Sequence, residues 1–407
     1  APLILVDGME RGMNDIDINE IESFSVLKDA SATAVFGVKG ANGVILITTK
    51  RGQLGKAKIT FESNVSAKTI SSLKGPVDSY QSLLARNYAI VSELAVGGDL
   101  IWNAFYIPER ELNYYRDKVD TEKYPDLDWF DFMTRDYGIS TKSNISASGG
   151  TEFVKYFASV GYINDGDILN TANPNAKGVT PEYTYRRFNF RSNLDFSITK
   201  TTQLGVNLSG YFGKQQTANG NFPKTMSGLM TSSPNMPLPI YSDGTYGGGD
   251  AKYNTNPYMD LMTMGTNVYN RYAFNSDFQL RQKLDFLLKG LEFKGRFSFD
   301  NYFNTRGREI GDEMGSYTTK YYDRLTDQWV YTIPGTTTGF EPMPSPLTYS
   351  LETVESDVLR NIYYEFGFTF DRTFDSHRIG ALMLMSRENF VTGDDWPSKR
   401  EDWVSRV

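Results

Sequence analysis

The first stretch of this sequence that could do chemistry is rich in glycine and lies near the N-terminus. From Val26 to Thr49 it reads VLKDASATAVFGVKGANGVILITT, with small residues and glycines between two short apolar runs. A phosphate-binding loop places its glycines after a strand and before a helix, so that the helix N-terminus faces the anion. Here we expect strands near 3–6, 22–27 and 44–49. Asp29 caps the expected helix at 30–36, Gly37 ends it, and the other glycines lead into the last of these strands. This order favours a packed α/β lobe over a nucleotide site.

Side chains that could act as catalytic bases or nucleophiles are scarce. The 407 residues contain no cysteine and one histidine, which excludes disulfides, thiolate metal sites and a cysteine nucleophile. The histidine, His377, stands at an expected strand start, where a turn or packing role is commoner than general-base catalysis. Asp126 and Asp128 form a carboxylate pair, but a DLD loop usually caps a helix or is solvated. The sequence therefore predicts no catalytic residue, no metal, no cofactor and no enzyme activity.

The overall composition narrows the class of protein further. A net charge of -7, from 42 Lys+Arg against 49 Asp+Glu, gives no global basic field for nucleic acid. The longest apolar run is far shorter than the ~20 residues of a membrane helix. Aromatic residues make up 14% of the chain, with 26 Tyr and 26 Phe, more than a soluble core requires. Because the chain opens abruptly on APLILVDG, we expect a fragment that is cut at both ends.

The elements that must position any site are strands, because apolar and polar residues alternate strictly from residue 186 onward. Five segments share this period of two: 187–198, 203–212, 272–286, 293–300 and 361–371. The third is about three times as long as the ~5–6 residues of an average globular strand. The pattern predicts long strands with one apolar face and one polar face.

The connections between these strands alternate between short and long. Short links are expected near 149–151, 199–201, 288–290 and 373–376, and long links over 70–137, 164–185, 214–270 and 305–357. All long links then leave one edge of the sheet, as in outer-membrane barrels, whose lipid face and interfacial girdles would use the surplus aromatic residues. Within the third long link, the glycines at 243–249 predict a flexible tip. A secreted or surface-exposed β-rich glycan-binding protein without transport activity is the alternative.

Two stretches of the sequence resemble a known family. PLILVDGM and the following NEIESFSVLKDASATAVFGVKGANGVILITTKRG resemble the second half of the plug domain in SusC/RagA-type TonB-dependent outer-membrane transporters. DLDWFDFMTRDYGISTKSNISASGG and YRRFNFRSNLDFSITKTTQLGVNLSG are similar to early barrel segments of that family. The sequence departs from the family pattern at residues 24–25 and 38–39. The plug signature carried over by the resemblance comprises Asp7, Gly8, Glu22, Lys28, Asp29, Gly37, Gly40, Asn42 and Gly43.

The resemblance implies a mainly β fold. Residues 1–56 would be the C-terminal part of a small α/β plug, and 57–407 the N-terminal part of a transmembrane barrel with long extracellular loops, about nine of roughly 22 antiparallel strands. It also implies a location in the outer membrane, in contact with lipid. The implied function is TonB-dependent import of oligosaccharides or peptides with a SusD-like lipoprotein, driven by the TonB–ExbB–ExbD complex through a segment missing here.

Two sets of side chains are candidates for this function. The polar inner faces can hydrogen-bond the plug, although solvation of a lumen wall is the simpler interpretation for each residue; examples are Arg187, Arg191, Asp195, Asp277, Arg281 and Lys283. Exposed aromatic rings in the long loops could stack on sugar faces; the candidates are Trp102, Tyr106, Tyr241, Tyr246 and Trp329. We expect Trp129, in the DLDW sequence, to be a packing anchor instead.

Overall fold

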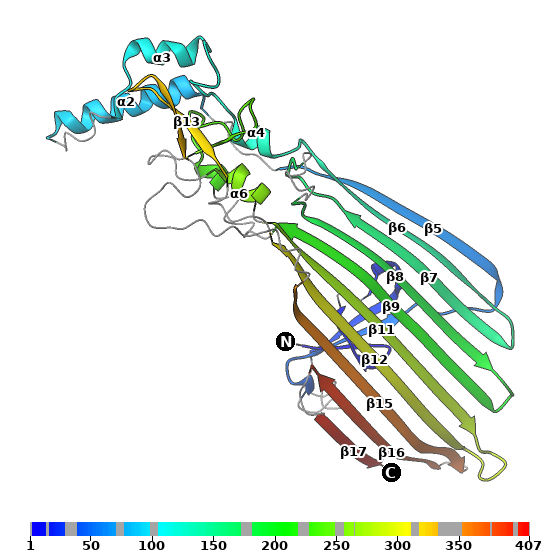
Figure 1. Cartoon of the computed structure of the whole chain (residues 1–407). Coiled ribbons are helices and arrows are strands. Elements are labelled where there is room, and N and C mark those ends of the chain that lie inside the picture. The colour runs from blue at the N-terminus through cyan, green and yellow to red at the C-terminus, as the bar shows by residue number, and fades with distance from the viewer. Residues whose placement is uncertain are drawn as a thin grey trace.

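The structure is a computed structural model that consists of three parts, which we call the N-terminal lobe, the wall and the cap (Figure 1). The residues that it describes are 2–13, 16–28, 39–70, 77–97, 105–171, 181–218, 228–248, 256–263, 265–310, 317–332, 352–374, 377–393 and 398–406.

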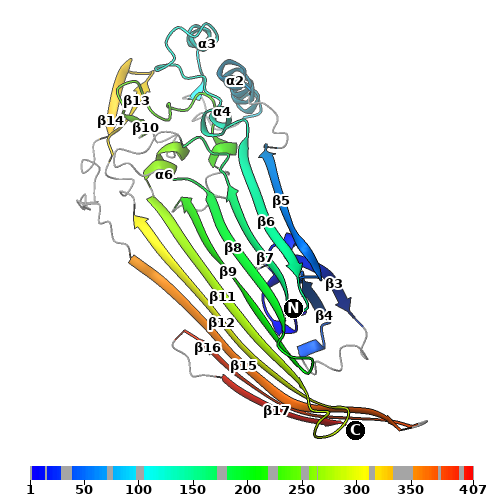
Figure 2. The same cartoon turned by 90° about the vertical axis from the view of Figure 1, so that its right-hand side faces the viewer.

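The wall is one curved antiparallel sheet of ten strands, each paired with its neighbour along the chain (Figures 1 and 2). The prediction of about nine strands in sequence order is confirmed for the order and falls one short in number. The strands are β5 (Gly55–Lys68), β6 (Gly138–Gly150), β7 (Val154–Asp165), β8 (Thr184–Ser197), β9 (Thr202–Ala218), β11 (Gly265–Lys283), β12 (Leu291–Ile310), β15 (Glu352–Phe374), β16 (His377–Thr392) and β17 (Ser398–Arg406).

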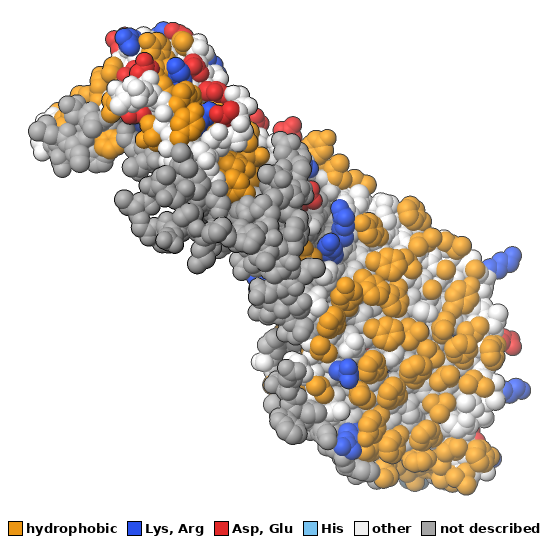
Figure 3. Space-filling model, viewed as in Figure 1, with side chains coloured by type: hydrophobic (Ala, Val, Ile, Leu, Met, Phe, Trp, Pro, Cys, Tyr) orange, Lys and Arg blue, Asp and Glu red, His pale blue; other side chains and the backbone are white. Residues whose placement is uncertain are grey.

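The period of two sorts side chains onto the two faces of the wall, because successive residues of a strand point to opposite sides. On β11, Asp277 is 1% exposed and its neighbour Phe278 is 40% exposed. On β8, Asn193 is fully buried on the inner face, whereas Phe188 is exposed on the outer face. The outer face is therefore mostly apolar over the strands of the wall (Figure 3). The predicted assignment of the two faces is confirmed.

The connections of the wall follow the predicted alternation. The short ones are 151–153, 198–201, 284–290 and 375–376, and the long ones are 69–137, 166–183, 219–264 and 311–351. The final connection, 393–397, is an exception, because it is short although it lies at the edge of the sheet where the other connections are long. No described helix is sufficiently long and apolar to cross a membrane.

The N-terminal lobe is a small sheet that lies against the inner face of the wall (Figure 2). Its order is β2-β1-β4-β3, with β1 parallel to β4. The predicted strands at β1, β3 and β4 are confirmed, whereas β2 and a short 3-10 helix were not predicted. The predicted helix at 30–36, with Asp29 and Gly37, lies outside the described residues. The elements are β1 (Leu3–Val6), β2 (Met9–Glu10), η2 (Ile18–Glu20), β3 (Ile21–Leu27) and β4 (Val44–Thr49).

A glycine marks the passage from the lobe to the wall. Gly52 is buried in the segment between β4 and β5, against the backbone of β6 and β7 next to the turn that joins them. A Cβ atom at this position would lie 2.2 Å from the backbone nitrogen of Tyr156. Only glycine therefore fits here, and the chain is held close to the wall at the end of the short turns.

The long connections build the third part, the cap, which stands beyond one end of the wall (Figure 1). Glu122, in the first long connection, accepts a hydrogen bond from the Ser242 N–H in the third, at 3.0 Å. Arg324, in the fourth, forms an ion pair with Glu111 in the first, also at 3.0 Å. The cap elements are α2 (Ser79–Ala95), α3 (Glu109–Arg116), α4 (Trp129–Met133), β10 (Tyr246–Gly247), α6 (Pro257–Thr263), β13 (Thr319–Asp323) and β14 (Gln328–Thr332).

The expectation of a flexible tip at 243–249 is wrong for its described residues. Tyr246 and Gly247 form β10, which pairs in parallel with β13. Asp243 accepts a hydrogen bond from Lys320 Nζ at 2.6 Å. A pairing strand and an ion pair from a distant connection thus order a segment that reads locally as a turn.

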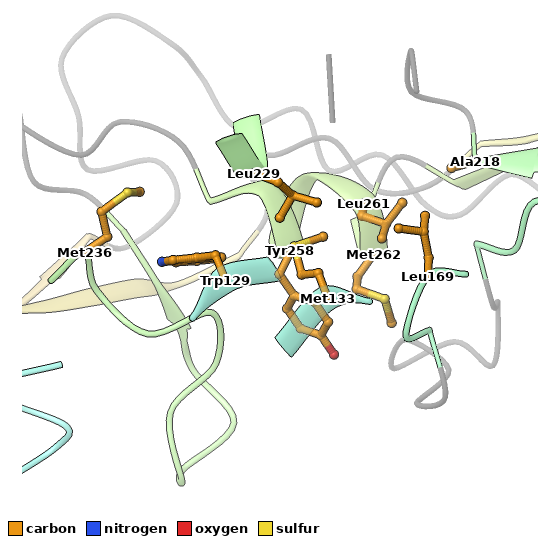
Figure 4. Packing of buried hydrophobic residues seen from close by; sticks show 9 residues of the cluster. All are labelled: Trp129, Met133, Leu169, Ala218, Leu229, Met236, Tyr258, Leu261 and Met262. Carbon is orange, nitrogen blue, oxygen red and sulfur yellow. The ribbon is translucent and has the colours of Figure 1, made fainter. Parts of the chain in front are cut away.

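An apolar cluster closes the cap against the end of the wall (Figure 4). Trp129 lies within it and is 3% exposed, so the prediction of a packing anchor is confirmed. The carboxylate of Asp128 caps α4, and that of Asp126 accepts from the Ser79 N–H, as a DLD loop was expected to do. The cluster members are Trp129, Met133, Leu169, Ala218, Leu229, Met236, Tyr258, Leu261 and Met262.

Candidate functional site

The surface between the lobe and the wall is built from rows of inward side chains. Strand pairing places an inward residue of one strand beside an inward residue of the next strand. We call such a line of neighbouring inward residues across the sheet a row. One row runs from Asn193 through Asn207 and Asp277 to Ser298, and the next from Arg191 through Ser209 and Asn275 to Asp300. Both rows face the lobe, and their members are polar.

Arg11, just after β2, makes the most elaborate contact with these rows. Its guanidinium donates to Asp277 at 2.9 and 3.1 Å and to Asp300 at 2.7 and 3.0 Å. All three side chains are at least 96% buried. A buried charge costs several kcal/mol unless it is paired, so each member of this group depends on the others.

Glu20 makes the corresponding contact with opposite charge. The 3-10 helix η2 holds its carboxylate against the wall, where only 2% of the residue is exposed. It accepts hydrogen bonds from Arg191 Nε at 2.8 Å, Ser159 Oγ at 3.0 Å and Asn189 Nδ2 at 3.1 Å. Charge-assisted bonds of this kind are the stronger class of hydrogen bond.

Further polar contacts join β4 and the β1–β2 turn to the wall. Asn193 Nδ2 donates to Thr49 Oγ1 at 2.9 Å and to the Lys50 carbonyl at 2.8 Å. Arg51 forms an ion pair with Asp195 at 2.8 Å. Arg296 donates to the carbonyl of Asp7 at 2.6 Å. These contacts between the lobe and the wall are hydrogen bonds and ion pairs rather than apolar packing.

The prediction that inner-face charges hydrogen-bond the plug is confirmed for Arg191, Asp195 and Asp277. For these three, solvation is the wrong interpretation. Arg281 and Lys283, near the short turns, are exposed, as solvation requires. Arg187 is buried, and its guanidinium lies 4.3 Å from the centre of the Tyr211 ring.

The sequence did not single out Arg11 or Glu20. Their only signal was indirect, since a charged inner face requires a plug with complementary charges. Arg11 follows β2 and Glu20 is the last residue of η2, and both elements are too short to show a periodic pattern. Arg11 is separated from Asp300 by 289 residues, so nothing local links the two.

The described members of the plug signature fall into two groups. Asp7 and Gly8 form the β1–β2 turn with φ of 50° and 86°, and Gly43 has φ of 90° before β4. A Cβ at Gly8 would lie 3.0 Å from Arg296 Nη1, so the bare turn lets this guanidinium reach the Asp7 carbonyl. Gly40 is buried, whereas the other members are exposed: Glu22, Lys28 and Asn42.

A cavity of about 1120 Å³ opens between lobe and wall, on the side of the long connections. Arg11 and Lys39 reach it from the lobe, and Lys39 lies 2.6 Å from Glu10 and 3.9 Å from Glu388 of β16. The wall contributes tyrosine and arginine side chains, among them Tyr185, Arg187, Tyr211, Arg271 and Tyr302. This mixture can hydrogen-bond a polar ligand and stack on its flat faces.

The aromatic candidates in the loops lie in the cap, with unequal exposure. Tyr106 is 42% exposed, as expected. Tyr241 is only 4% exposed, so the expectation of an exposed ring is wrong for it. Its ring lies 5.3 Å from that of Trp329, and Lys320 Nζ lies 4.6 and 4.7 Å from the two ring centres. Trp329 is half-buried in this stack, which holds the strands of the cap together.

Tyr246 and Trp102 complete the aromatic candidates. Tyr246 is half-buried and packs against Tyr258 and Tyr317, with ring centres 6.3 and 5.4 Å apart. Trp102 lies outside the described residues. A hydrogen bond from Lys320 lowers the pKa of the Asp243 carboxyl to about 2, so this ion pair beside Tyr241 is charged at neutral pH.

Comparison with known proteins agrees with the fold. No family model matches the chain. The TonB-dependent receptor P26 of Formosa agariphila is 28% identical over 290 residues, which is 69% of this chain and 26% of the relative. The TonB-dependent receptor SusC of Bacteroides thetaiotaomicron is 28% identical over 259 residues, which is 60% of this chain and 21% of the relative.

Solved structures show the same architecture. The RagAB peptide importer in its open-open state aligns over 100% of this chain and 45% of its own, with a TM-score of 0.62 and 19% identity. In sequence and in fold the chain is similar to SusC/RagA-type TonB-dependent receptors. A SusC/RagA-type receptor belongs in the outer membrane, and the apolar outer face of the wall fits that location. The chain spans about a quarter of the length of the curated relatives it matches.

Proposed function

We propose that this chain belongs to an energy-coupled importer of the outer membrane, in which the N-terminal lobe is a plug that moves to admit substrate. The polar surface between lobe and wall supports this proposal most directly. Hydrogen bonds to a wall can be exchanged for hydrogen bonds to water at small net cost, about 0.5–1.5 kcal/mol each. Apolar packing of the same area would resist separation, since exposed apolar surface costs about 25 cal/mol per Å².

The proposal extends to the partners of the whole receptor. TonB, with ExbB and ExbD, would supply the force on the lobe, and a SusD-like lipoprotein would close the chamber from outside. The substrates would be oligosaccharides or peptides. Support comes from the likeness to SusC and to the RagAB importer, whose substrates are peptides. The cavity beside the lobe supplies the space for a polar oligomer.

The alternative is a secreted or surface-exposed glycan-binding protein without transport. Such a protein would bury the apolar face of its sheet in a soluble core. In this structure rings on that face, such as Phe274 and Phe278 of β11, are about two-fifths exposed. The polar face is the one that a second element, the lobe, covers. The arrangement therefore favours a lipid-facing outer surface.

An engineered cross-link between lobe and wall tests the proposal in the whole receptor. Thr49 and Asn193 touch at 2.9 Å, and the chain has no cysteine of its own, so the pair Thr49→Cys with Asn193→Cys can form a lock. We expect substrate uptake by cells to stop when the pair is oxidised, to return on reduction, and to require TonB throughout. The single variant Thr49→Cys is the matched control. Unchanged uptake through a fully cross-linked receptor would refute a moving plug.

A further inference from the structure

Above the rows that hold the lobe, the inner face of the wall changes character. The next row passes from Asn189 through Tyr211 and Ala273 to Tyr302, and the row beyond it from Arg187 through Gly213 and Arg271 to Asn304. One row further, Tyr185 and Tyr269 point inward, and Arg306 lies 5.4 Å from the Tyr269 ring. Arginines and tyrosines thus interleave across three rows. We call Tyr185, Arg187, Tyr211, Arg271 and Tyr302, which all line the cavity, the arginine–tyrosine patch.

A glycine separates the two arginines of the patch. Gly213 on β9 pairs with Arg187 of β8 on one side and with Arg271 of β11 on the other. The two arginines are therefore two strand spacings apart, about 9–10 Å at the backbone. A Cβ at Gly213 would lie 3.3 Å from the hydroxyl oxygen of Tyr185, so the Tyr185 ring leans over this gap. Arg187 and Arg271 thus flank a position that has no side chain of its own, and the Tyr185 ring lies over it.

Among the described residues that line the cavity, the carboxylates are those of Glu10 and Glu388. Glu10 and Glu388 flank Lys39, and Asp277 and Asp300 bind Arg11. Arg187 stacks on Tyr211, which fixes the plane of its fork, and Arg271 is exposed toward the cavity. Arg271 therefore presents its positive charge to the space where a ligand would lie.

We infer that the arginine–tyrosine patch binds the acidic groups of an oligosaccharide, either carboxylates or sulfate esters. This inference rests on the proposed function and names its substrate class. Guanidinium forks bind carboxylate and sulfate in two parallel hydrogen bonds, and tyrosine rings cover the flat faces of sugars. A sugar fits better than an extended peptide, because the backbone N–H and C=O groups of β8, β9 and β11 are already paired within the sheet. The groups left to bind a ligand are therefore side chains: aromatic rings, guanidinium groups and an amide.

Binding to the whole receptor in outer-membrane vesicles tests the inference. The probes are a labelled oligogalacturonate, a neutral malto-oligosaccharide and an oligoglutamate of matched length. We expect the oligogalacturonate to bind most tightly, and its affinity to fall with added salt and about tenfold or more on Arg271→Gln. Arg281→Gln is the matched control, since it lies on the same strand and face but beyond the lobe, and it should leave the affinity unchanged. Arg271→Lys should restore part of it.

Equal affinity for the neutral and acidic sugars, or an equal effect of Arg281→Gln, would overturn the inference. Tighter binding of oligoglutamate would also overturn it, by assigning the patch to acidic peptides. Uptake measured in parallel with and without TonB separates the two proposals. If uptake is TonB-dependent but indifferent to Arg271→Gln, only the acidic-sugar inference fails, whereas TonB-independent uptake would refute the proposed function itself.

Discussion

Two interfaces in this molecule, one inside the cap and one between lobe and wall, are equally buried, but the first consists of apolar side chains and the second of polar ones. In the cap, Trp129 and Leu169 are at most 3% exposed and touch apolar neighbours. Between lobe and wall, Glu20 and Asn193 are at most 2% exposed and touch polar ones. Apolar packing depends on shape, whereas polar contacts depend on partners that water can replace. The molecule thus places its shape-dependent contacts in the cap and its exchangeable contacts under the lobe.

Removing the central cation under the lobe should test this contrast most severely. Arg11→Met leaves Asp277 and Asp300 buried without their partner, and we expect lobe docking to weaken by about 3–5 kcal/mol. Hydrogen exchange of β1 and β4 in the whole receptor measures the change. Arg51→Met is the control, because its ion pair with Asp195 is about one-third exposed and should contribute less than about 1 kcal/mol. Similar losses in both variants would contradict the special role of the buried group.

A substitution that creates a cavity in the cap should destabilise the cap through lost packing instead. Leu169→Ala removes a fully buried side chain, and we expect the cap to lose about 2–5 kcal/mol of stability. Limited proteolysis and hydrogen exchange in α4 and α6 follow this loss. Protection of the lobe strands should stay unchanged. If the lobe loosened equally, the two interfaces would form one cooperative unit and the comparison would fail.

The outer face of the wall extends the comparison to lipid. Phe278→Arg places a charge on the apolar face and should hinder insertion by about 2–4 kcal/mol, whereas Gln279→Arg points inward and should be tolerated. The folded, heat-modifiable fraction in purified outer membranes measures both. Equal tolerance at these neighbouring positions would show that the faces are misassigned.

The smallest expected effect is a loss of the Asp243–Lys320 ion pair of the cap at acid pH. The pKa of Asp243 is lowered to about 2 by Lys320, so the stabilisation it contributes is present above its ordinary pKa, near 4, and is lost as pH falls toward 2. Fluorescence of Trp329 should therefore stay constant from pH 7 to about 5 and change only at strongly acid pH. In Asp243→Asn this acid step should be absent. A step near pH 6 would point to another titrating group.

The difference between the two interfaces also explains what the sequence could predict. Strands such as β8 and β11 were predictable because their alternation is local and each strand carries many repeats of it. The apolar contacts of Trp129 were foreseeable from one bulky residue beside a helix cap. The cap sheet was not, since β10 holds two residues and depends on β13, which lies in another connection. The pairing of Arg11 with Asp277 and Asp300 was equally hidden, because these residues meet only after the sheet has formed.

The parallel pairing of β1 with β4, together with the buried Gly52, determines how the lobe bears mechanical load. A pull on β1 from its N-terminal side is resisted where the chain presses against the wall at Gly52, just after β4. Because the two strands run in the same direction, this load shears them along their length, and the four residue pairs from Leu3↔Val44 to Val6↔Ile47 share it at once. The contacts of Arg11 and Glu20 with the wall are separate from this strand pair and bear the load independently of it. A pull on β1 is therefore resisted by shear of the whole strand pair, and not by residue pairs that open one after another.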